Sequence, residues 1–187
     1  MKKEIYLAGG CFWGLSHLLK QIKGVKETIC GYANGNAISP SYKEVCSGNT
    51  EARECVKVIY DNTIASLENI LFNYFCVVNP HEKNKQGPDI GSQYQTGIYY
   101  LESDIETKKI VNRIYDLEKA GEKEFYIEKE SLKNFYPAEE YHQDYLDKNP
   151  NGYCHISFNT INLLKQLIIN PNDYVIKAKE LLDNYKK

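Results

Sequence analysis

The stretch "EIYLAGGCFWGLSHLL", residues 4–19, decides the fold because it joins two kinds of periodicity through a pair of glycines. Residues 4–9 are apolar and end in glycine, which is typical of a buried strand that enters a turn. From position 12 onward apolar residues recur at helical spacing and a glycine stop signal follows: Phe12, Leu15, Leu18, Leu19, Ile22 and then Gly24. We therefore expect a strand that passes through a glycine turn into a helix.

The rest of the chain repeats this alternation of strands and helices. Strand-like patterns occupy residues 25–33, 54–61, 96–101 and 124–130, and helical patterns occupy 66–78, 102–121, 138–150, 159–168 and 172–185. Two long polar loops, 34–53 and 79–95, interrupt them, and long loops tend to carry function. The order predicts an α+β fold, a two-layer α/β sandwich of the split β-α-β (ferredoxin-like) type. We expect a single domain over residues 1–187, with a motif-bearing core at about 4–155 and a helical tail at about 156–187.

Charge and cysteine usage limit the classes of function. The 23 basic and 25 acidic residues leave a formal charge of −2, which gives no general attraction for nucleic acid or anionic membranes. No apolar run approaches the ~20 residues of a membrane span, and the N-terminus lacks a secretory pattern, so we expect a cytoplasmic protein. The chain has six cysteines but no C-x-x-C motif and no secretory pattern, so we expect reduced thiols. Its four histidines lack metal-ligand spacing, so we expect no metal, and we expect no other cofactor.

Cys11 lies where the predicted turn ends, at or next to the N-cap of the helix. The free N–H groups and partial positive charge of a helix N-terminus favour thiolate over thiol, and Gly9 and Gly10 would let a ligand approach the sulfur. A small cysteine packed under a turn explains these residues equally well. Phe12 and Trp13 favour a reactive thiol, because such bulky residues at a helix start are explained as walls of a pocket over the sulfur. Phe12 also fits a purely structural place in the core.

Four separate segments carry a resemblance to a known family. In chain order they are "GGCFWG", "SYKEVCSGNT", "DIGSQYQTGIYY" and "FYPAEEYHQDYL…NGYC", and they extend from about Tyr6 to Cys154. Together they resemble the peptide methionine sulfoxide reductase A family, in which a cysteine reduces methionine sulfoxide to methionine. "GCFWG" alone would be only suggestive, whereas four motifs in the family's own order are far more specific.

The resemblance implies roles for five residues of the reducing step. Cys11 would attack the sulfoxide sulfur and become a sulfenic acid, and Glu54 would protonate the sulfoxide oxygen. Tyr42 and Tyr94 match tyrosines whose hydroxyls hydrogen-bond that oxygen, and Asp89 matches the aspartate that organises the site. The family pattern Gly-His-Ala-Glu reads Glu-Ala-Arg-Glu here, so a solvated strand-edge glutamate is the alternative for Glu54. If Glu54 is catalytic, an apolar pocket should raise its pKa.

The same resemblance implies a binding pocket and a recycling step. Phe12 and Trp13 would receive the S-methyl group, and oxygen donors on a fixed side would select the S epimer. Cys154, beside the aromatic Tyr153, would resolve the sulfenic acid into a Cys11–Cys154 disulfide that thioredoxin reduces. The implied substrates are oxidised proteins, peptides and free methionine sulfoxide, and the implied enzyme is a monomer that uses neither nucleic acid nor a membrane. The remaining cysteines are expected to be core or strand thiols: Cys30, Cys46, Cys55 and Cys76.

Two other functions fit part of these residues. A peroxidatic or peroxide-sensing protein would use Cys11 and Cys154 without a sulfoxide, but it gives no reason for Glu54 or the paired tyrosines. A module that binds methionine-bearing peptides on aromatic walls would need no thiol, so Cys11→Ser would leave its function intact. No cysteine follows Cys154, which predicts a two-cysteine cycle, and the tail lacks the Gly-rich ending usual in the family.

Overall fold

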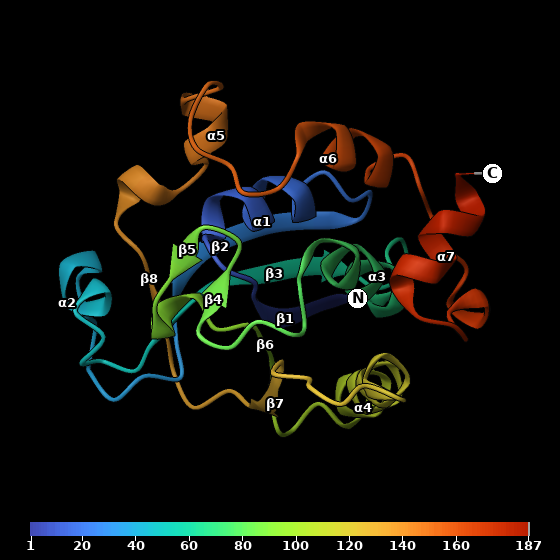
Figure 1. Cartoon of the computed structure of the whole chain (residues 1–187), viewed down its shortest axis with the longest axis horizontal. Helices are drawn as coiled ribbons and strands as arrows, with labels where there is room; N and C mark the ends of the chain where they lie inside the picture. Colours follow the sequence, from blue (N-terminus) through green and yellow to red (C-terminus); the bar gives the residue numbers. More distant parts are fainter. Residues whose placement is uncertain (187) are drawn as a thin grey trace.

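The computed structural model describes residues 1–186 and is built on one six-stranded sheet (Figure 1). Its strands are, in their order across the sheet, β7 (Glu128–Ser131), β6 (Gly97–Tyr100), β1 (Lys2–Ala8), β3 (Arg53–Asp61), β2 (Val25–Ala33) and β8 (Phe135–Pro137). Neighbouring strands are antiparallel except β6 and β7, which are parallel. Because β1 lies inside the sheet and is paired on both sides, the turn that follows it starts from a fixed position.

Helices cover one face of the sheet. Along β1, Ile5 and Leu7 belong to the main core under the helices, whereas Tyr6 and Ala8 belong to a small cluster on the other face, as strand alternation requires. The helices are α1 (Phe12–Leu19), α2 (Tyr42–Cys46), α3 (Leu67–Val77), α4 (Ile105–Lys119), α5 (Tyr145–Lys148), α6 (Phe158–Leu164) and α7 (Ala178–Tyr185). Short 3-10 turns form η1 (Ser92–Tyr94), η2 (Glu140–His142) and η3 (Pro171–Asp173), and β4 (Lys85–Gln86) pairs with β5 (Asp89–Ile90) in a small hairpin.

The expected α+β fold is confirmed. The order β6-β1-β3-β2 is the one that two interleaved β-α-β units produce, since α1 connects β1 to β2, α3 leads from β3 toward β6, and each connection skips one strand. The structure adds β7 and β8 at the two edges of the sheet. The predicted strand at 124–130 begins only at Glu128.

The segment 138–150 is not the single helix that its spacing predicts. It divides into η2 and α5, because Asp144 adopts a left-handed backbone conformation (φ 51°) just before α5. The break lets Gln143 bond to the edge of β2, where its side chain donates to the Cys30 carbonyl and accepts from the Cys30 N–H, each at 2.9 Å. This pairing extends the β8 ladder by one residue and fixes the position of η2.

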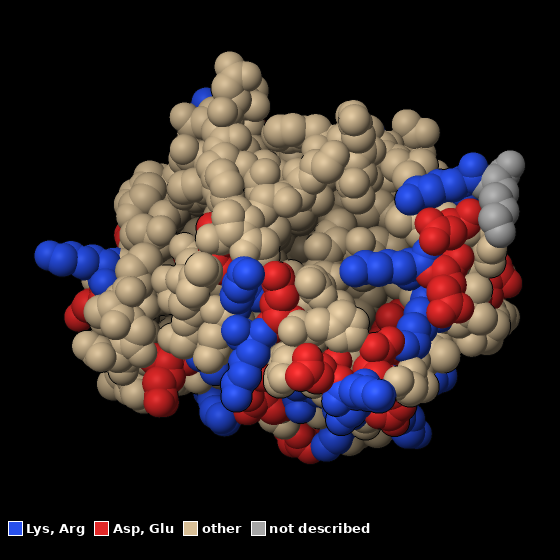
Figure 2. Space-filling model, viewed as in Figure 1, with Lys and Arg blue, Asp and Glu red and all other residues tan. Residues whose placement is uncertain are grey.

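The C-terminal tail packs on the helical layer. Glu118 of α4 is buried and accepts hydrogen bonds from the Tyr174 hydroxyl at 2.7 Å and from the Ala178 N–H at 2.6 Å. Figure 2 shows acidic and basic side chains mixed over the lower part of this face, where α4 lies, and over its right side, where α7 lies, with few over α5 and α6. Within residues 1–186, no helix combines the length and the apolar character that crossing a membrane requires.

Candidate active site

Cys11 occupies the N-cap position of α1, where the chain leaves β1 through two glycines. Its side chain is only 7 % exposed. Burial, and then the nearby carboxyl of Glu54, raise the pKa of the Cys11 thiol well above its ordinary value, although the Trp13 N–H lowers it. Desolvation thus opposes the helix N-terminus at this position and favours the thiol form of Cys11.

Glu54 lies on β3 with its carboxyl toward α1 and is 1 % exposed. Its Oε2 accepts a 3.1 Å hydrogen bond from the N–H of Phe12, the residue after Cys11. Burial raises the pKa of Glu54 to about 8, against the lowering effect of the Phe12 N–H, so the carboxyl keeps its proton at neutral pH. Its burial excludes the alternative of a solvated strand-edge glutamate. Cys55 points to the opposite face of the sheet, as strand alternation predicts.

Two tyrosines from the long loops lie near Glu54. The loop predicted at 34–53 contains α2, which begins with a capping box between Ser41 and Glu44 and has Tyr42 as its first residue. Tyr94 ends η1. Burial raises the pKa of both hydroxyls, and the neighbouring carboxyl of Glu54 adds to the effect. Both tyrosines therefore keep the proton that a hydrogen bond to a substrate oxygen needs.

Phe12 and Trp13 follow Cys11 in different surroundings. Phe12 is buried, with its ring centre 5.1 Å from that of His142. The Trp13 ring stacks on Tyr145, with centres 3.7 Å apart and planes 11° from parallel, and its indole N–H donates to His142 Nδ1 at 3.1 Å. Stacking on Tyr145 and the hydrogen bond to His142 thus fix the Trp13 ring, which forms an aromatic wall beside the Cys11 thiol.

His142 and Tyr145 belong to this arrangement, although the sequence did not single them out. His142 is 1 % exposed and packs against the rings of Trp13 and Tyr42. Burial lowers the pKa of His142, so the ring is neutral, and its Nδ1 acts as the acceptor for Trp13. The available signal was a histidine between tyrosines in 138–150. With 138–150 predicted as one continuous helix, nothing in the sequence indicated that His142 and Tyr145 pack against Trp13.

The loop that carries Cys154, residues 149–157, lies against the start of α1. Its Tyr153 hydroxyl donates to Asp89 Oδ2 at 2.8 Å, and Asp89 comes from β5 in the second long loop. A β-carbon at Gly14 would stand 2.9 Å from Cys154 Sγ, so the sulfur packs directly on the α1 backbone, one turn after the N-cap. Every cysteine in residues 1–186 is a free thiol.

The remaining cysteines differ in exposure. Cys30 and Cys55 are buried and Cys76 is half-buried, which agrees with core or strand thiols. Cys46 does not agree, because it ends the short surface helix α2 and is exposed.

The glycines before Cys11 serve packing rather than access to the sulfur. A β-carbon at Gly9 would stand 3.0 Å from a methyl group of Leu15. Gly10 has a φ of 80°, a conformation that favours glycine, and a β-carbon there would stand 2.7 Å from the Gln86 side chain. Side chains of the protein itself occupy the space beside both glycines. The expected approach of a ligand to the Cys11 sulfur past Gly9 and Gly10 is therefore closed.

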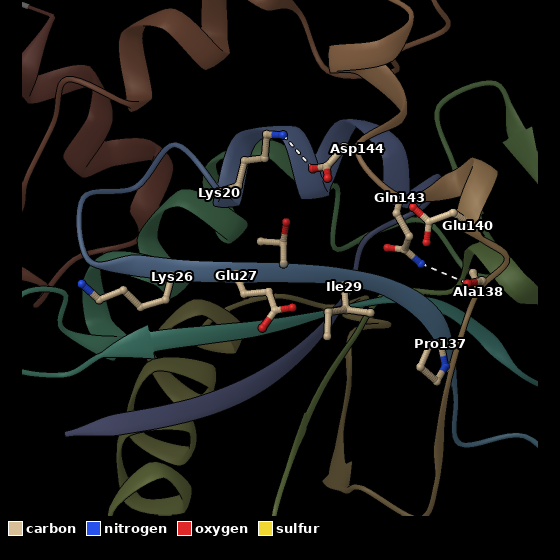
Figure 3. Close-up of a pocket in the computed structure, with 10 residues that line it drawn as sticks. Lys20, Lys26, Glu27, Ile29, Pro137, Ala138, Glu140, Gln143 and Asp144 are labelled. Carbon is tan, nitrogen blue, oxygen red and sulfur yellow. Dashed lines mark hydrogen bonds and ion pairs between the residues drawn. The ribbon is translucent and has the colours of Figure 1, made fainter.

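A separate hollow of about 520 Å³ lies along the free edge of β2, beneath α1 (Figure 3). Lys20 pairs with Asp144 on one side of it, and Gln143 donates to the Ala138 carbonyl on the other. Its lining consists of Lys20, Lys26, Glu27, Thr28, Ile29, Pro137, Ala138, Glu140, Gln143 and Asp144. None of these is a predicted site residue. Nor do residues 1–186 contain a group of three or more His, Cys, Asp or Glu side chains arranged to hold a metal ion.

Comparison with known proteins gives consistent matches. A family model described as peptide methionine sulfoxide reductase matches residues 3–169. The chain is 50 % identical over 155 residues to peptide methionine sulfoxide reductase MsrA of Clostridium perfringens, covering 82 % of this chain and 98 % of that protein. It is 51 % identical over 157 residues to the MsrA of Mycoplasma genitalium, covering 83 % and 99 %. Among solved structures, reduced Mxr1 from Saccharomyces cerevisiae matches with a TM-score of 0.73 and 37 % identity, over 82 % of this chain and 88 % of that one.

Proposed function

The chain belongs to the peptide methionine sulfoxide reductase family, and we propose that it reduces methionine sulfoxide with Cys11 as the nucleophile and Glu54 as the acid. One observation carries the assignment of roles. A buried carboxyl that keeps its proton at neutral pH faces the first turn of the helix that Cys11 caps. Sulfoxide oxygen is a poor leaving group until it is protonated, so a thiol needs an acid of this kind beside it.

The reaction transfers one oxygen atom from the substrate to the enzyme. Cys11 Sγ attacks the sulfoxide sulfur while Glu54 protonates the oxygen, and Tyr42 and Tyr94 donate hydrogen bonds to that oxygen as its charge develops. The attack forms a bond between Cys11 Sγ and the substrate sulfur. The protonated oxygen then bonds to Cys11 Sγ while the substrate S–O bond and the new S–S bond break, so methionine leaves and Cys11 carries the oxygen as a sulfenic acid. Glu54 gives one proton to the oxygen and takes back the thiol proton of Cys11, so it ends the step protonated.

The aromatic wall decides how the substrate enters. Trp13 and Phe12 offer apolar faces to the S-methyl group, and contact between sulfur and an aromatic ring contributes about 0.3–1.5 kcal/mol. The tyrosine hydroxyls stand with Glu54 on the side of the oxygen. A methyl group on one side and an oxygen on the other select one epimer, for which we propose the S form.

Recycling uses the second thiol of the cycle. Cys154 resolves the sulfenic acid into a Cys11–Cys154 disulfide, and thioredoxin reduces this disulfide by thiol exchange. The yeast protein Mxr1 has been solved in complex with Trx2. A reducing compartment such as the cytoplasm suits this cycle, because all cysteines in the described part of the chain are free thiols. A single domain acting as a monomer stays a prediction.

The experiment is a turnover assay with a peptide that contains methionine S-sulfoxide and with dithiothreitol as reductant. We expect the wild-type enzyme to release methionine. In Cys11→Ser the rate of methionine release should fall more than about 1000-fold. Cys76→Ser removes a half-buried thiol that contacts the Ala178 carbonyl of the tail, and it should keep the wild-type rate. Unchanged turnover in Cys11→Ser, or no turnover in wild type, contradicts the proposal. Fast reaction with peroxide in the absence of sulfoxide turnover would favour the peroxidatic alternative.

A further inference from the structure

His155 follows Cys154 and fills a space that two glycines leave at the start of α1. Its Nε2 lies 3.1 Å from the Gly9 carbonyl oxygen. A β-carbon at Gly10 would stand 3.4 Å from Nε2, and one at Gly14 would stand 3.4 Å from Nδ1. The ring is therefore wedged against the turn that positions the reactive thiol.

The hydrogen bond to Gly9 decides which ring nitrogen carries the proton. A carbonyl oxygen only accepts, so Nε2 donates and Nδ1 keeps its lone pair. Nδ1 is buried and has no hydrogen-bond partner among the described residues. Burial also lowers the pKa of His155, which keeps the ring neutral at physiological pH. The ring thus holds an unused base inside the protein, and a buried polar atom without a partner needs an explanation.

The free lone pair lies on the same face of α1 as the Cys154 thiol. A β-carbon at Gly14 would stand 3.4 Å from His155 Nδ1 and 2.9 Å from Cys154 Sγ, so both atoms border one point of the helix surface. The thiol now donates to the Ile156 carbonyl at 3.0 Å, and burial raises the pKa of Cys154. A thiol that holds its proton in this way needs a base before it attacks another sulfur.

We propose that His155 is the base that activates Cys154 in the resolving step, an inference that rests on the proposed function because Cys11 must first become a sulfenic acid. Nδ1 takes the Cys154 proton, and the thiolate attacks Cys11 Sγ. The S–S bond forms while the S–O bond of the sulfenic acid breaks, and the departing hydroxide takes the proton from Nδ1 to leave as water. Cys154 is oxidised, Cys11 is reduced to the disulfide level, and no further reactant is needed.

The groups around His155 favour transient protonation of its ring. Asp89 of β5 is the charged group that faces the ring, and it stabilises the imidazolium that forms during the transfer. Gln86 of β4 and the glycines around the ring carry no charge. Because burial dominates, the ring returns its proton readily once the hydroxide leaves.

The test uses the full chain in a single turnover with one equivalent of methionine S-sulfoxide, so that methionine release and loss of free thiols are timed separately. His155→Gln keeps an N–H for the Gly9 carbonyl but has no basic lone pair. We expect disulfide formation in this variant to slow about 10- to 100-fold relative to methionine release. Its rate should rise about tenfold per pH unit with the thiolate fraction. In wild type the rate should be level at neutral pH and fall only below the ordinary histidine pKa of about 6.5, because burial lowers the pKa of His155.

The matched control is His81→Gln, which changes an exposed histidine and should keep the wild-type ratio and pH profile. A His155→Gln variant that closes the disulfide as fast as wild type overturns the inference. If that variant does not fold, the wild-type profile decides alone, because a disulfide rate that climbs about tenfold per pH unit throughout rules out a neutral base. Wild type that releases no methionine refutes the proposed function itself, and a normal release with unchanged disulfide kinetics refutes only the role of His155.

Discussion

The pocket beside Cys11 and the loop that carries Cys154 meet on α1 but are held in different ways. In the pocket, Glu54 and His142 are each 1 % exposed, and they come from a central strand and from a turn tied to the sheet edge. In the loop, Tyr153 is 42 % exposed and reaches the site through one hydrogen bond to Asp89. Cys11 is thus set among buried side chains, whereas Cys154 lies on a loop that combines packed residues with exposed ones.

The difference follows from what each region has to do. Charge that develops on a sulfoxide oxygen is stabilised best by donors already in place, and burial keeps them in place. The Cys154 sulfur must instead leave the Ile156 carbonyl and reach the N-cap of α1. A surface loop with exposed residues opens at a lower cost in free energy than a fully buried pocket. Substitutions in the pocket should therefore slow the reduction of the sulfoxide, and substitutions in the loop should slow the formation of the disulfide.

Removing the thiol of the loop gives the largest expected effect on the complete cycle. In Cys154→Ser, thioredoxin-supported turnover should stop after the first methionine, because no disulfide forms for thioredoxin to reduce. Dithiothreitol should still support repeated turnover, since a small thiol reaches the sulfenic acid directly. The measurement is methionine released per enzyme with each reductant, and Cys76→Ser is the control. Normal turnover of Cys154→Ser with thioredoxin would remove Cys154 from the cycle.

Removing the acid of the pocket should affect the first half alone. Glu54→Gln keeps the shape of the side chain but donates no acidic proton, so methionine release should slow about 100- to 1000-fold. In wild type, release should also decline as the pH rises through about 8, where Glu54 loses its proton, and this decline should be absent from the variant. Glu118→Gln, at a buried glutamate of α4, is the matched control. Equal release by Glu54→Gln and wild type is the opposing result.

Loosening the aromatic wall should have a smaller effect. His142→Ala removes the acceptor of the Trp13 indole N–H and the ring packed beside it. Loss of one such hydrogen bond corresponds to about 1 kcal/mol, so KM for the sulfoxide should rise about fivefold. Steady-state kinetics with dithiothreitol measure it, with His81→Ala as control. An unchanged KM would mean that Trp13 keeps its position without His142.

The pH dependence of stability concerns the free energy of unfolding rather than the catalytic cycle. The native pKa of Glu54, about 8, exceeds that of an unfolded glutamate, about 4.3, so the folded state binds more protons between these values. Its contribution is complete below the lower value and is lost as the pH rises. Wild type should therefore lose up to about 1.4 kcal/mol per pH unit in free energy of unfolding relative to Glu54→Gln. Urea unfolding of both proteins from about pH 4.5 to 8 tests this, and parallel curves would argue against a buried protonated carboxyl.

Sequence patterns predicted the scaffold, and the family resemblance predicted most of the pocket. The strand that leads to Cys11 and the strand that begins beside Glu54 were visible from their apolar residues and the turn residues that bound them. Tyr42, Tyr94 and Asp89 followed only from the resemblance, since polar loops have no periodicity from which their convergence could be read. The structure brings all three near Glu54 or the Cys154 loop.

Protonation states and the divided helix were beyond the sequence. A helix N-terminus favours a thiolate locally, but the opposing burial of Cys11 depends on the whole fold. Helical spacing in 138–150 concealed the left-handed Asp144 that separates His142 from Tyr145. Likewise, Gly9 and Gly10 indicated an open approach to the sulfur, but the structure packs Leu15 and Gln86 against them. The third glycine of the motif, Gly14, accommodates Cys154 and His155 from far along the chain.

The most direct test is the fate of the substrate oxygen in Cys154→Ser after one equivalent of methionine S-sulfoxide. With no resolving thiol, the oxygen should remain on the enzyme. Mass spectrometry should find one methionine released per chain and one oxygen atom added to Cys11, captured by a sulfenic acid reagent. Methionine release without oxygen on Cys11, or the oxygen on another cysteine, would contradict Cys11 as the nucleophile.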